Sequence, residues 1–428
     1  MNILTCLLYI FVLRLCLNFS NIFTSSIAAD IITAVEYNKA GDWLAAADKG
    51  GRVVIFRKNV TTPGKSLRES LTCIPHFQFQ AFEVEFDFLK SLDIESKINQ
   101  VRFYEIPNKV ALLTANDRTI KFWKINDRYE HACDSVKALK QGKSLRLPKK
   151  KGASTATAKA CRLYKNAHAY HINSLDICSD AATFLSADDL RINLWNIERS
   201  DTAFNLVDFK PLNMTELNEV ITCTRYFPEQ SNLFHFSTSK GILRVSDLRE
   251  SACTTSYSKT FKGISGDTNT PKGAYTELIS AITDVKLSQS ERYFAVRDYM
   301  TVKVWDIRME IEPVDTITVH DHIEPHMSEL YSSEAIFDKF EICFSPDGTK
   351  ILTGSYNNKF YVYDVSNPSV PIAEASTPDF ISDNDSDSGD PSSSFNPSKR
   401  NLHYAYHPSG DGIAVAGLAG LHLYHLSL

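Results

Sequence analysis

The chain has 428 residues, of which 43% are hydrophobic and 23% charged, a composition typical of soluble globular proteins rather than of disordered or fibrous ones. Its 46 basic and 51 acidic residues give a net charge of -5, which excludes a protein that binds nucleic acid by neutralising many phosphates over its whole surface. Nine cysteines without a C-x-x-C pair argue against a secreted disulfide framework and a zinc cluster, and they favour a reducing compartment.

The N-terminal residues support two interpretations. Residues 3–13 form an apolar run, and residues 26–28 have the small-x-small spacing of a signal-peptide cleavage site. However, no Lys or Arg precedes the run, and Arg14 interrupts a stretch that is already too short to span a membrane. The segment at 8–12 is also rich in strand-forming residues. We therefore treat residues 1–28 as an atypical segment, either a strand of the following domain or a signal sequence, with secretion the weaker interpretation.

Internal repetition determines the architecture that we expect from about Asp30 onward. Seven stretches share one plan: an apolar strand, a turn, a second apolar strand, a polar turn, and an alternating strand that usually ends in an aromatic residue. The third strands are residues 52–56, 119–123, 191–195, 243–246, 302–305, 360–363 and 421–424. Trp123, Trp195 and Trp305 occupy the same place in this strand.

The repeats resemble WD repeats. Asp247, Asp306 and Asp364 follow three of the third strands, as in the Trp-Asp signature. Each unit supplies three strands and needs a fourth from the next linker, so the sequence predicts an all-β, seven-bladed WD-repeat β-propeller. The last unit leaves no residues for its own fourth strand. We therefore expect the ring to close with a strand from the N-terminal segment, around residues 7–19.

Spacing between the repeats is irregular because the linkers before several first strands are long. In WD propellers these linkers open on one face, together with the turns between second and third strands. Insertions gathered on one face of a repeat protein usually mark its binding surface. The segments concerned are residues 85–97, 201–219, 274–278 and 330–338.

Several strings in the linkers resemble the WD-repeat B-type regulatory subunit of protein phosphatase 2A. They include Phe-Asp-Phe-Leu-Lys-Ser-Leu at 86–92, Asn-Ala-His-Ala-Tyr-His-Ile-Asn-Ser at 166–174 and Ile-Phe-Asp-Lys-Phe-Glu at 336–341. Propeller packing does not dictate linker sequences, so these strings are more specific than a Trp-Asp pair. The resemblance covers residues 29–428, which we expect to form one propeller.

The resemblance implies a non-catalytic protein that docks on a helical-repeat scaffold subunit next to the catalytic phosphatase subunit. There it would present phosphoprotein substrates, with a preference for phosphosites that have basic residues nearby. Holding a substrate near another protein's active centre raises its effective concentration without chemistry in this chain. The alternative is a general WD-repeat interaction protein without phosphatase assembly. Neither interpretation requires a cofactor, nucleic acid or membrane, and both place the protein in the cytoplasm, with the nucleus as a further compartment.

The resemblance also implies an acidic, substrate-binding groove on the open face, led by Asp189 and Leu217. Asp189 lies in the turn before a third strand, where a partly desolvated carboxylate can accept charge-assisted hydrogen bonds from substrate Arg or Lys. Leu217, on the following linker, would supply an apolar neighbour. An Asp in such a turn can instead serve only to stabilise it. The other positions that match the family around this face are Lys49, Lys90, Asp93, Lys97, Tyr170, His171, Tyr331 and Lys339.

Some residues depart from the family pattern, and these departures bear on substrate preference. Ala274 and Tyr275 stand where the family has two Phe residues. Ala28 replaces an acidic residue, and Glu334 replaces an Asp.

Two insertions interrupt the predicted propeller. Residues 127–165, in the second unit, correspond to a projecting arm that touches the scaffold in the family, but residues 149–158 are basic and small where apolar residues are usual. The Pro-Lys-Lys-Lys string at 148–151 matches a nuclear-localisation pattern, although a solvated loop explains it better. Residues 378–399 are acidic and rich in serine, and we expect a disordered loop there.

We expect no catalytic residues and no metal site in this chain. The sequence contains no G-x-S-x-G, Walker or H-E-x-x-H motif, and no Cys has an identifiable activating partner. His320, His322 and His326 have a spacing that a metal could use, but they lie on a predicted linker without a regular element to orient them.

Overall fold

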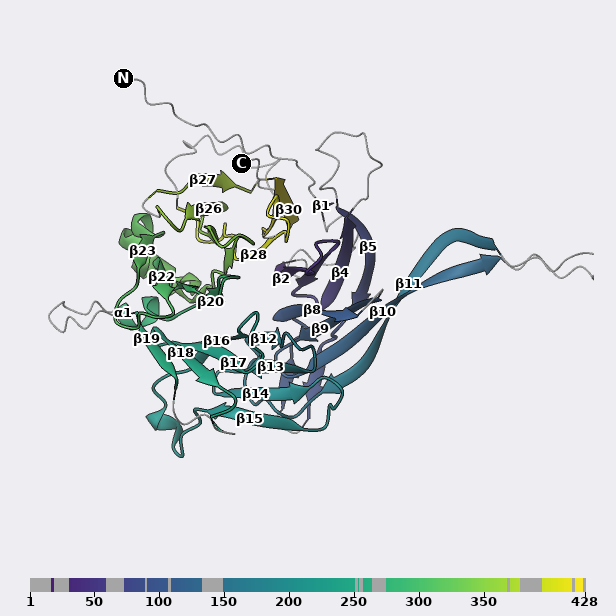
Figure 1. Ribbon diagram of the computed structural model, residues 1–428, viewed down its shortest axis with the longest axis horizontal. Helices are drawn as coiled ribbons and strands as arrows, with labels where there is room; N and C mark the ends of the chain where they lie inside the picture. Colours follow the sequence, from purple (N-terminus) through teal and green to yellow (C-terminus); the bar gives the residue numbers. More distant parts are fainter. Residues whose placement is uncertain are drawn as a thin grey trace, which may run out of the picture.

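Seven antiparallel sheets form a ring in the computed structural model (Figure 1). The structure describes residues 17–18, 31–58, 73–88, 91–106, 109–132, 149–250, 253, 257–263, 275–367, 370–377, 395–417 and 420–425. Over these ranges, seven sheets of four strands are arranged as blades around a central opening. The predicted seven-bladed β-propeller is therefore confirmed.

In each blade the first strand faces the central opening, and successive strands lie farther out (Figure 1). Blade 1 contains β2 (Ile32–Tyr37), β3 (Trp43–Asp48), β4 (Arg52–Lys58) and β5 (Cys73–Gln80). Blade 2 contains β8 (Gln100–Ile106), β9 (Lys109–Ala115), β10 (Ile120–Ala132) and β11 (Lys149–Tyr164). Blade 3 contains β12 (Ser174–Ile177), β13 (Thr183–Ala187), β14 (Arg191–Asn196) and β15 (Ala203–Asp208). Blade 4 contains β16 (Ile221–Tyr226), β17 (Leu233–Thr238), β18 (Ile242–Asp247) and β19 (Lys259–Lys262).

The remaining blades follow the same order. Blade 5 contains β20 (Asp284–Leu287), β21 (Tyr293–Arg297), β22 (Thr301–Asp306) and β23 (Asp315–Thr318). Blade 6 contains β24 (Ile342–Phe344), β25 (Lys350–Gly354), β26 (Lys359–Asp364) and β27 (Ala373–Ser376). Blade 7 contains β28 (His403–Tyr406), β29 (Gly412–Ala416), β30 (Gly420–His425) and β1 (Leu17–Asn18). The seven third strands read from the sequence are β4, β10, β14, β18, β22, β26 and β30.

The ring closes on the N-terminal segment. Leu17 pairs with Leu421, and Asn18 pairs with Gly420, so β1 is the fourth strand of blade 7. The segment at 8–12, which the sequence also offered for this strand, lies outside the described residues. Because β1 comes from the opposite end of the chain, it joins the first and last parts of the sequence in one sheet.

The hydrophobic core lies between neighbouring blades, so most central strands are buried on both faces. In β14 of blade 3, Trp195 is 2% exposed and packs edge-on against Tyr164 of blade 2, with ring centroids 5.3 Å apart. Trp305 of β22 is 1% exposed and packs edge-on against Phe261 of blade 4 at 5.5 Å. The tryptophan column seen in the sequence therefore belongs to the packing between blades.

The long linkers share one end of the ring with the turns between second and third strands, and we call this end the upper face. This follows because the fourth strand of each blade runs toward that end, and the first strand of the next blade runs away from it. The linkers carry the hairpin β6 (Glu85–Asp87) and β7 (Leu92–Ile94), the 3-10 helices η4 (Met214–Glu216), η5 (Asp321–His326) and η6 (Ala335–Phe337), and the helices α1 (Thr276–Ile279) and α2 (Met327–Ser332).

An arm extends from blade 2. Strands β10 and β11 continue past the ring as a paired hairpin from Asn126 opposite Thr157 to Ala132 opposite Lys149, and this hairpin points away from the propeller (Figure 1). The structure thus places an arm within the predicted range 127–165. Residues 133–148 and most of the acidic insertion, at 378–394, lie outside the described residues.

Candidate functional site

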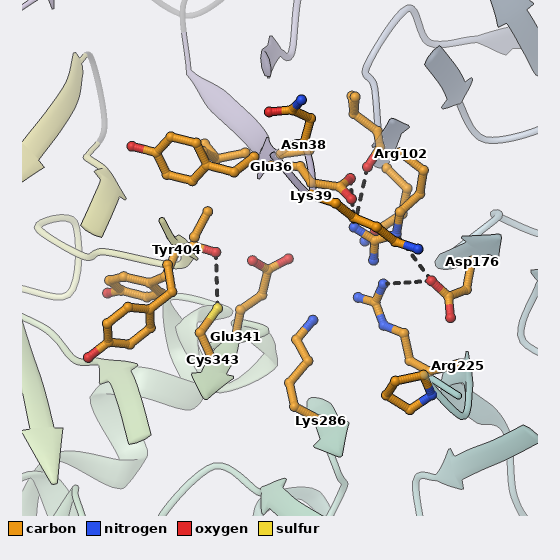
Figure 2. Close-up of a pocket in the computed structure, with 18 of the residues that line it drawn as sticks. Glu36, Asn38, Lys39, Arg102, Asp176, Arg225, Lys286, Glu341, Cys343 and Tyr404 are labelled. Atoms are coloured by element: carbon orange, nitrogen blue, oxygen red, sulfur yellow. Dashed lines mark hydrogen bonds and ion pairs between the residues drawn. The ribbon is translucent and has the colours of Figure 1, made fainter. Parts of the chain in front are cut away.

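The central channel holds a cavity of about 360 Å³, and charged side chains from the inner ends of the blades line it (Figure 2). Glu36 comes from β2, Arg102 from β8, Asp176 from β12, Arg225 from β16 and Lys286 from β20. Blades 1 to 5 therefore each contribute one charged side chain to the cavity from their first strand. This regular placement surrounds the channel with charges of both signs.

Ion pairs in the channel connect four consecutive blades. Arg102 Nη1 donates to Glu36 Oε2 at 3.0 Å, and its Nε lies 3.6 Å from Asp176 Oδ1. Asp176 also lies 3.8 Å from Arg225 Nη1 (Figure 2). In addition, Arg102 Nε donates to the carbonyl oxygen of Leu175 at 2.9 Å. Arg102 therefore bridges blades 1 and 3 from its position in blade 2.

Burial dominates the ionisation of the channel groups. It raises the pKa of Glu36 and of Asp176, although the neighbouring Arg102 guanidinium opposes both shifts. Burial also raises the pKa of the Cys343 thiol to about 12, so this cysteine stays protonated at neutral pH and is not an activated nucleophile. The ion pairs among these groups link neighbouring blades, which is a structural role, although Arg102 Nη2 and Arg225 Nε are buried without a hydrogen-bond partner among the described residues.

Asp189 lies on the upper face, in the turn between β13 and β14, and is half-buried. Its neighbour Asp188 stabilises this turn, because Asp188 Oδ1 accepts hydrogen bonds from the backbone N–H groups of Leu190 at 2.8 Å and Arg191 at 2.7 Å. The turn-stabilising role that the sequence left open for Asp189 is therefore performed by Asp188.

The surroundings of Asp189 contain charges of both signs. Burial raises its pKa, while the nearby Lys339 and His171 oppose the shift and Asp188 adds to it. Conversely, desolvation lowers the pKa of the Lys339 ammonium, Asp189 opposes that shift, and Lys97 adds to it. The fold thus brings together residues from blade 3 and from the linkers into blades 2, 3 and 6. A partly desolvated carboxylate among such groups can bind an incoming cation.

Leu217 directly follows η4 and is half-buried on the linker that joins blades 3 and 4. The backbone N–H of Ile221, at the end of the same linker, donates to the carbonyl oxygen of Asp189 at 2.8 Å. Leu217 and Asp189 therefore lie on two adjacent segments that are hydrogen-bonded to each other.

The other predicted positions also lie in turns and linkers of the upper face. Lys49 is exposed in the β3–β4 turn, Asp93 is exposed in β7, and Lys97 is half-buried in the segment that enters blade 2. Tyr170 is half-buried in the linker into blade 3, and Lys90 lies outside the described residues.

Two further predicted residues make specific contacts. His171 is exposed, and its Nδ1 lies 3.0 Å from Asp117 Oδ2. Tyr331 is exposed on α2, and its ring packs against the ring of Tyr275 at 5.5 Å. Tyr275, which stands where the family has a Phe, therefore keeps an aromatic contact at this place.

A hydrogen-bonded tetrad stabilises blade 3 beneath Asp189. His168 joins Asp188 Oδ2 at 3.1 Å and Ser186 Oγ at 2.6 Å, and Trp195 Nε1 donates to the same hydroxyl at 2.9 Å. Burial opposes ionisation of Asp188, but its hydrogen bonds, first the one from His168, outweigh burial and lower the pKa of the carboxyl. The tetrad fixes the turn that presents Asp189.

The residues of the channel were missed by the sequence reasoning. Their signal is present, since five consecutive first strands each carry a charged residue where a propeller strand is otherwise apolar, namely Glu36, Arg102, Asp176, Arg225 and Lys286. The pattern alone does not reveal the channel, because a charge on a strand that borders solvent looks the same in sequence as one that lines a channel.

Two of the three histidines near residue 320 lie on a regular element. His322 and His326 belong to η5, so the prediction of a linker without regular structure was wrong. His320 is fully buried, with its Nδ1 2.6 Å from the carbonyl oxygen of Tyr299 and its Nε2 3.3 Å from Arg297 Nη2. Over the described ranges, no group of three or more metal-binding side chains is gathered. Nor does any helix in that part of the chain have the length and apolar character to cross a membrane.

Comparison with known proteins identifies the repeats. The family model of the WD domain, G-beta repeat, matches residues 340–364, a range that begins just before β24 and finishes at the end of β26. The match falls on blade 6, where the predicted signature residue Asp364 ends the third strand.

Curated relatives match most of the chain. The 55 kDa regulatory subunit of protein phosphatase PP2A from Drosophila melanogaster is 40% identical over 420 residues, which are 92% of this chain and 83% of the relative. The PP2A regulatory B subunit of Schizosaccharomyces pombe is 45% identical over 78% of this chain and 73% of its own length. The protein of the same name from Candida tropicalis is 44% identical over 78% of this chain and 67% of its own length. The chain therefore belongs to the family of PP2A regulatory B subunits and is a non-catalytic regulator of that phosphatase.

Proposed function

We propose that this regulatory protein binds the helical-repeat scaffold subunit and the catalytic subunit of PP2A and presents phosphoprotein substrates on its upper face. The substrates would carry basic residues near the phosphosite. The observation that supports this proposal is the pairing of Asp189 with Leu217 on two adjacent segments joined by the hydrogen bond from Ile221 N–H to the Asp189 carbonyl oxygen.

The chemistry of this pair suits a basic peptide. Asp189 is half-buried and its pKa is raised chiefly by burial, so the carboxylate is incompletely solvated before a substrate arrives. A substrate guanidinium or ammonium would supply the charge-assisted hydrogen bonds that water provides only in part. Leu217, with the exposed Met214 on the same linker, offers apolar surface for the side chains that flank the basic residue.

The arm and the upper face would have separate tasks. The β10–β11 hairpin extends away from the propeller, which supports a role in reaching the scaffold subunit (Figure 1). The upper face would then remain open toward substrate. Assembly in the cytoplasm, with the nucleus as a second compartment, completes the proposal.

The test replaces Asp189 by lysine in the tagged full-length chain and measures both assembly and substrate binding. We expect Asp189→Lys to leave copurification of the scaffold and catalytic subunits unchanged and to weaken binding of a basic phosphoprotein by about 2 kcal/mol, roughly thirty-fold. Asp180→Lys is the matched control, because Asp180 is an exposed carboxylate in a turn at the opposite end of the same blade.

Three outcomes would count against the proposal. Unchanged binding of basic phosphoproteins by Asp189→Lys would exclude this residue as a substrate anchor. Equal losses in Asp189→Lys and Asp180→Lys would indicate a nonspecific charge effect. Purification of the wild-type chain without the scaffold and catalytic subunits would favour a general WD-repeat interaction protein.

A further inference from the structure

The linker that carries Leu217 is held mainly by its two ends. Its helix η4 contains no buried residue, and Leu212 just before it is fully exposed. Local hydrogen bonds shape the middle: Asn213 Oδ1 accepts from Thr215 N–H at 3.2 Å, and Leu217 N–H donates to the Met214 carbonyl oxygen at 3.3 Å. These bonds give the segment its form but do not attach it to the propeller. Its place on the upper face therefore depends on residues at the ends.

Both ends of this linker are attached to the turn that contains Asp189. At the first end, the N–H of Phe209 donates to the carbonyl oxygen of Leu190 at 2.8 Å. At the second end, the N–H of Ile221 donates to the carbonyl oxygen of Asp189, also at 2.8 Å. A shift of either end would therefore change the distance between Leu217 and Asp189.

A single side chain from the next blade contacts residues at both ends. Arg244, in the third strand of blade 4, places its guanidinium 5.5 Å from the ring centroid of Phe209, at the first end. Its Nη2 donates to both carboxylate oxygens of Glu219, near the second end, at 2.9 and 3.3 Å. The Arg244 side chain is 12% exposed, and that of Glu219 is 19% exposed, so solvent screens this pair only weakly.

Aromatic rings fix the guanidinium in this position. Arg244 also lies 4.9 Å from the ring centroid of Tyr257 and 5.9 Å from that of Phe236. Phe236 packs edge-on against Phe209 at 6.0 Å and against Tyr257 at 5.6 Å. The planar guanidinium is therefore surrounded by three rings, an arrangement that a lysine ammonium cannot reproduce.

We propose that Arg244 is a positioning residue for the substrate-binding surface, which it holds by clamping both ends of the Leu217 linker. This inference rests on the proposed function of Asp189 and Leu217. The clamp keeps the exposed apolar residues of the linker at a set distance from the Asp189 carboxylate before a substrate binds. Ordering a binding loop in advance removes part of the entropic cost of association, so affinity improves without any contact between Arg244 and the substrate.

The test compares Arg244→Met, Leu217→Ala and the double variant in purified PP2A complexes that contain the full-length chain. The substrate is a phosphoserine protein with lysine and arginine near the phosphosite, and p-nitrophenyl phosphate serves as a substrate too small to use the surface. We expect Arg244→Met to raise KM for the phosphoprotein about five-fold, with kcat unchanged. We expect both constants for p-nitrophenyl phosphate to stay at their wild-type values.

The double variant separates positioning from a general loss of structure. If Arg244 acts through the linker, adding Arg244→Met to Leu217→Ala raises KM by much less than about five-fold, because the residue being positioned is already lost. Arg244→Lys should recover little, since lysine cannot fill the site between the three rings. Arg292→Met is the matched control. Arg292 also contacts an aromatic ring, Tyr293 at 5.0 Å, and a carboxylate, Asp306 at 3.2 Å. These contacts lie in blade 5 at the end away from the upper face.

Each result has a definite meaning. If Leu217→Ala leaves KM unchanged, the proposed substrate surface is wrong. If Leu217→Ala raises KM and Arg244→Met does not, the surface stands and the positioning role is wrong. Additive effects in the double variant, or loss of scaffold and catalytic subunits from Arg244→Met complexes, would also overturn positioning. Should Arg244→Met fail to fold, Glu219→Gln removes the charge pair while retaining the aromatic contacts of Arg244, and an increase in KM of about two-fold is then expected.

Discussion

Replacing Arg102 by methionine should destabilise the propeller more than replacing any exposed arginine. The side chain is 13% exposed and serves two carboxylates, Glu36 in blade 1 and Asp176 in blade 3. Methionine preserves most of the length and apolar stem but removes the charge. Both carboxylates would then lie in the channel with less compensation.

The magnitude follows from the loss of a buried charge partner. Removing one member of a buried ion pair costs about 3–5 kcal/mol, because the remaining charge is left without compensation. Access of solvent to the cavity of about 360 Å³ reduces this cost, while the lost hydrogen bond from Arg102 Nε to the Leu175 carbonyl oxygen adds to it. We therefore expect Arg102→Met to lower the free energy of unfolding by about 3 kcal/mol.

Equilibrium urea unfolding measures this loss, with Arg249→Met as the control. Arg249 also pairs with a carboxylate, Asp247 at 2.6 Å, but its side chain is 68% exposed, so its removal should leave the urea midpoint near the wild-type value. Adding Glu36→Gln to Arg102→Met should recover part of the loss, since it removes one uncompensated charge. Equal midpoints for Arg102→Met and Arg249→Met, or no recovery in the double variant, would refute the reasoning.

Three further predictions concern single residues of the core. His235 is 1% exposed, and burial lowers its pKa from 6.5 to about 3. The unfolded chain therefore binds a proton at this residue near pH 6.5 while the folded chain does not, so the free energy of unfolding should fall as the pH drops from about 6.5 toward 3. Between about pH 7 and pH 5.5, urea unfolding should show that His235→Phe loses about 1 kcal/mol less free energy of unfolding than the wild-type chain. The same pH dependence in both proteins would contradict this. Gly354→Ala should destabilise by about 3 kcal/mol in urea, because a Cβ would lie 1.8 Å from the Tyr404 hydroxyl; a wild-type midpoint would mean that the site can relax. Ser186→Ala should lower the free energy of unfolding by about 2 kcal/mol, since it leaves the indole N–H of Trp195 without its acceptor. Unfolding followed by tryptophan fluorescence measures this loss, and a clearly smaller loss would contradict the prediction.

The predicted blades were correct because the information for them is local. A strand such as β14 is specified by its own alternation, and Trp195 is buried against Phe184, which the same pattern places in β13. The family could also be identified from contiguous strings in the linkers. By contrast, the sequence offered residues 7–19 for the closing strand, and the structure pairs only Leu17 and Asn18 of that range within the described residues.

The candidate site was predictable only in part. Residue positions such as Asp189 and Lys339 could be placed on one face, because linkers and turns alternate between the two ends of a propeller. The turn-stabilising role of Asp188 was not assigned, since two adjacent aspartates are equivalent in sequence until hydrogen-bond geometry distinguishes them.

The sequence by itself determined the repeat number, the order of strands in each blade and the family, because these depend on periodicity and on short contiguous strings. The tertiary structure decided which charges meet. Arg102 bridges Glu36 and Asp176 across three blades, and Lys339 reaches Asp189 from a distant part of the chain. Closing the ring creates these neighbours, and no local pattern records which residues will face one another across a channel or at both ends of a linker.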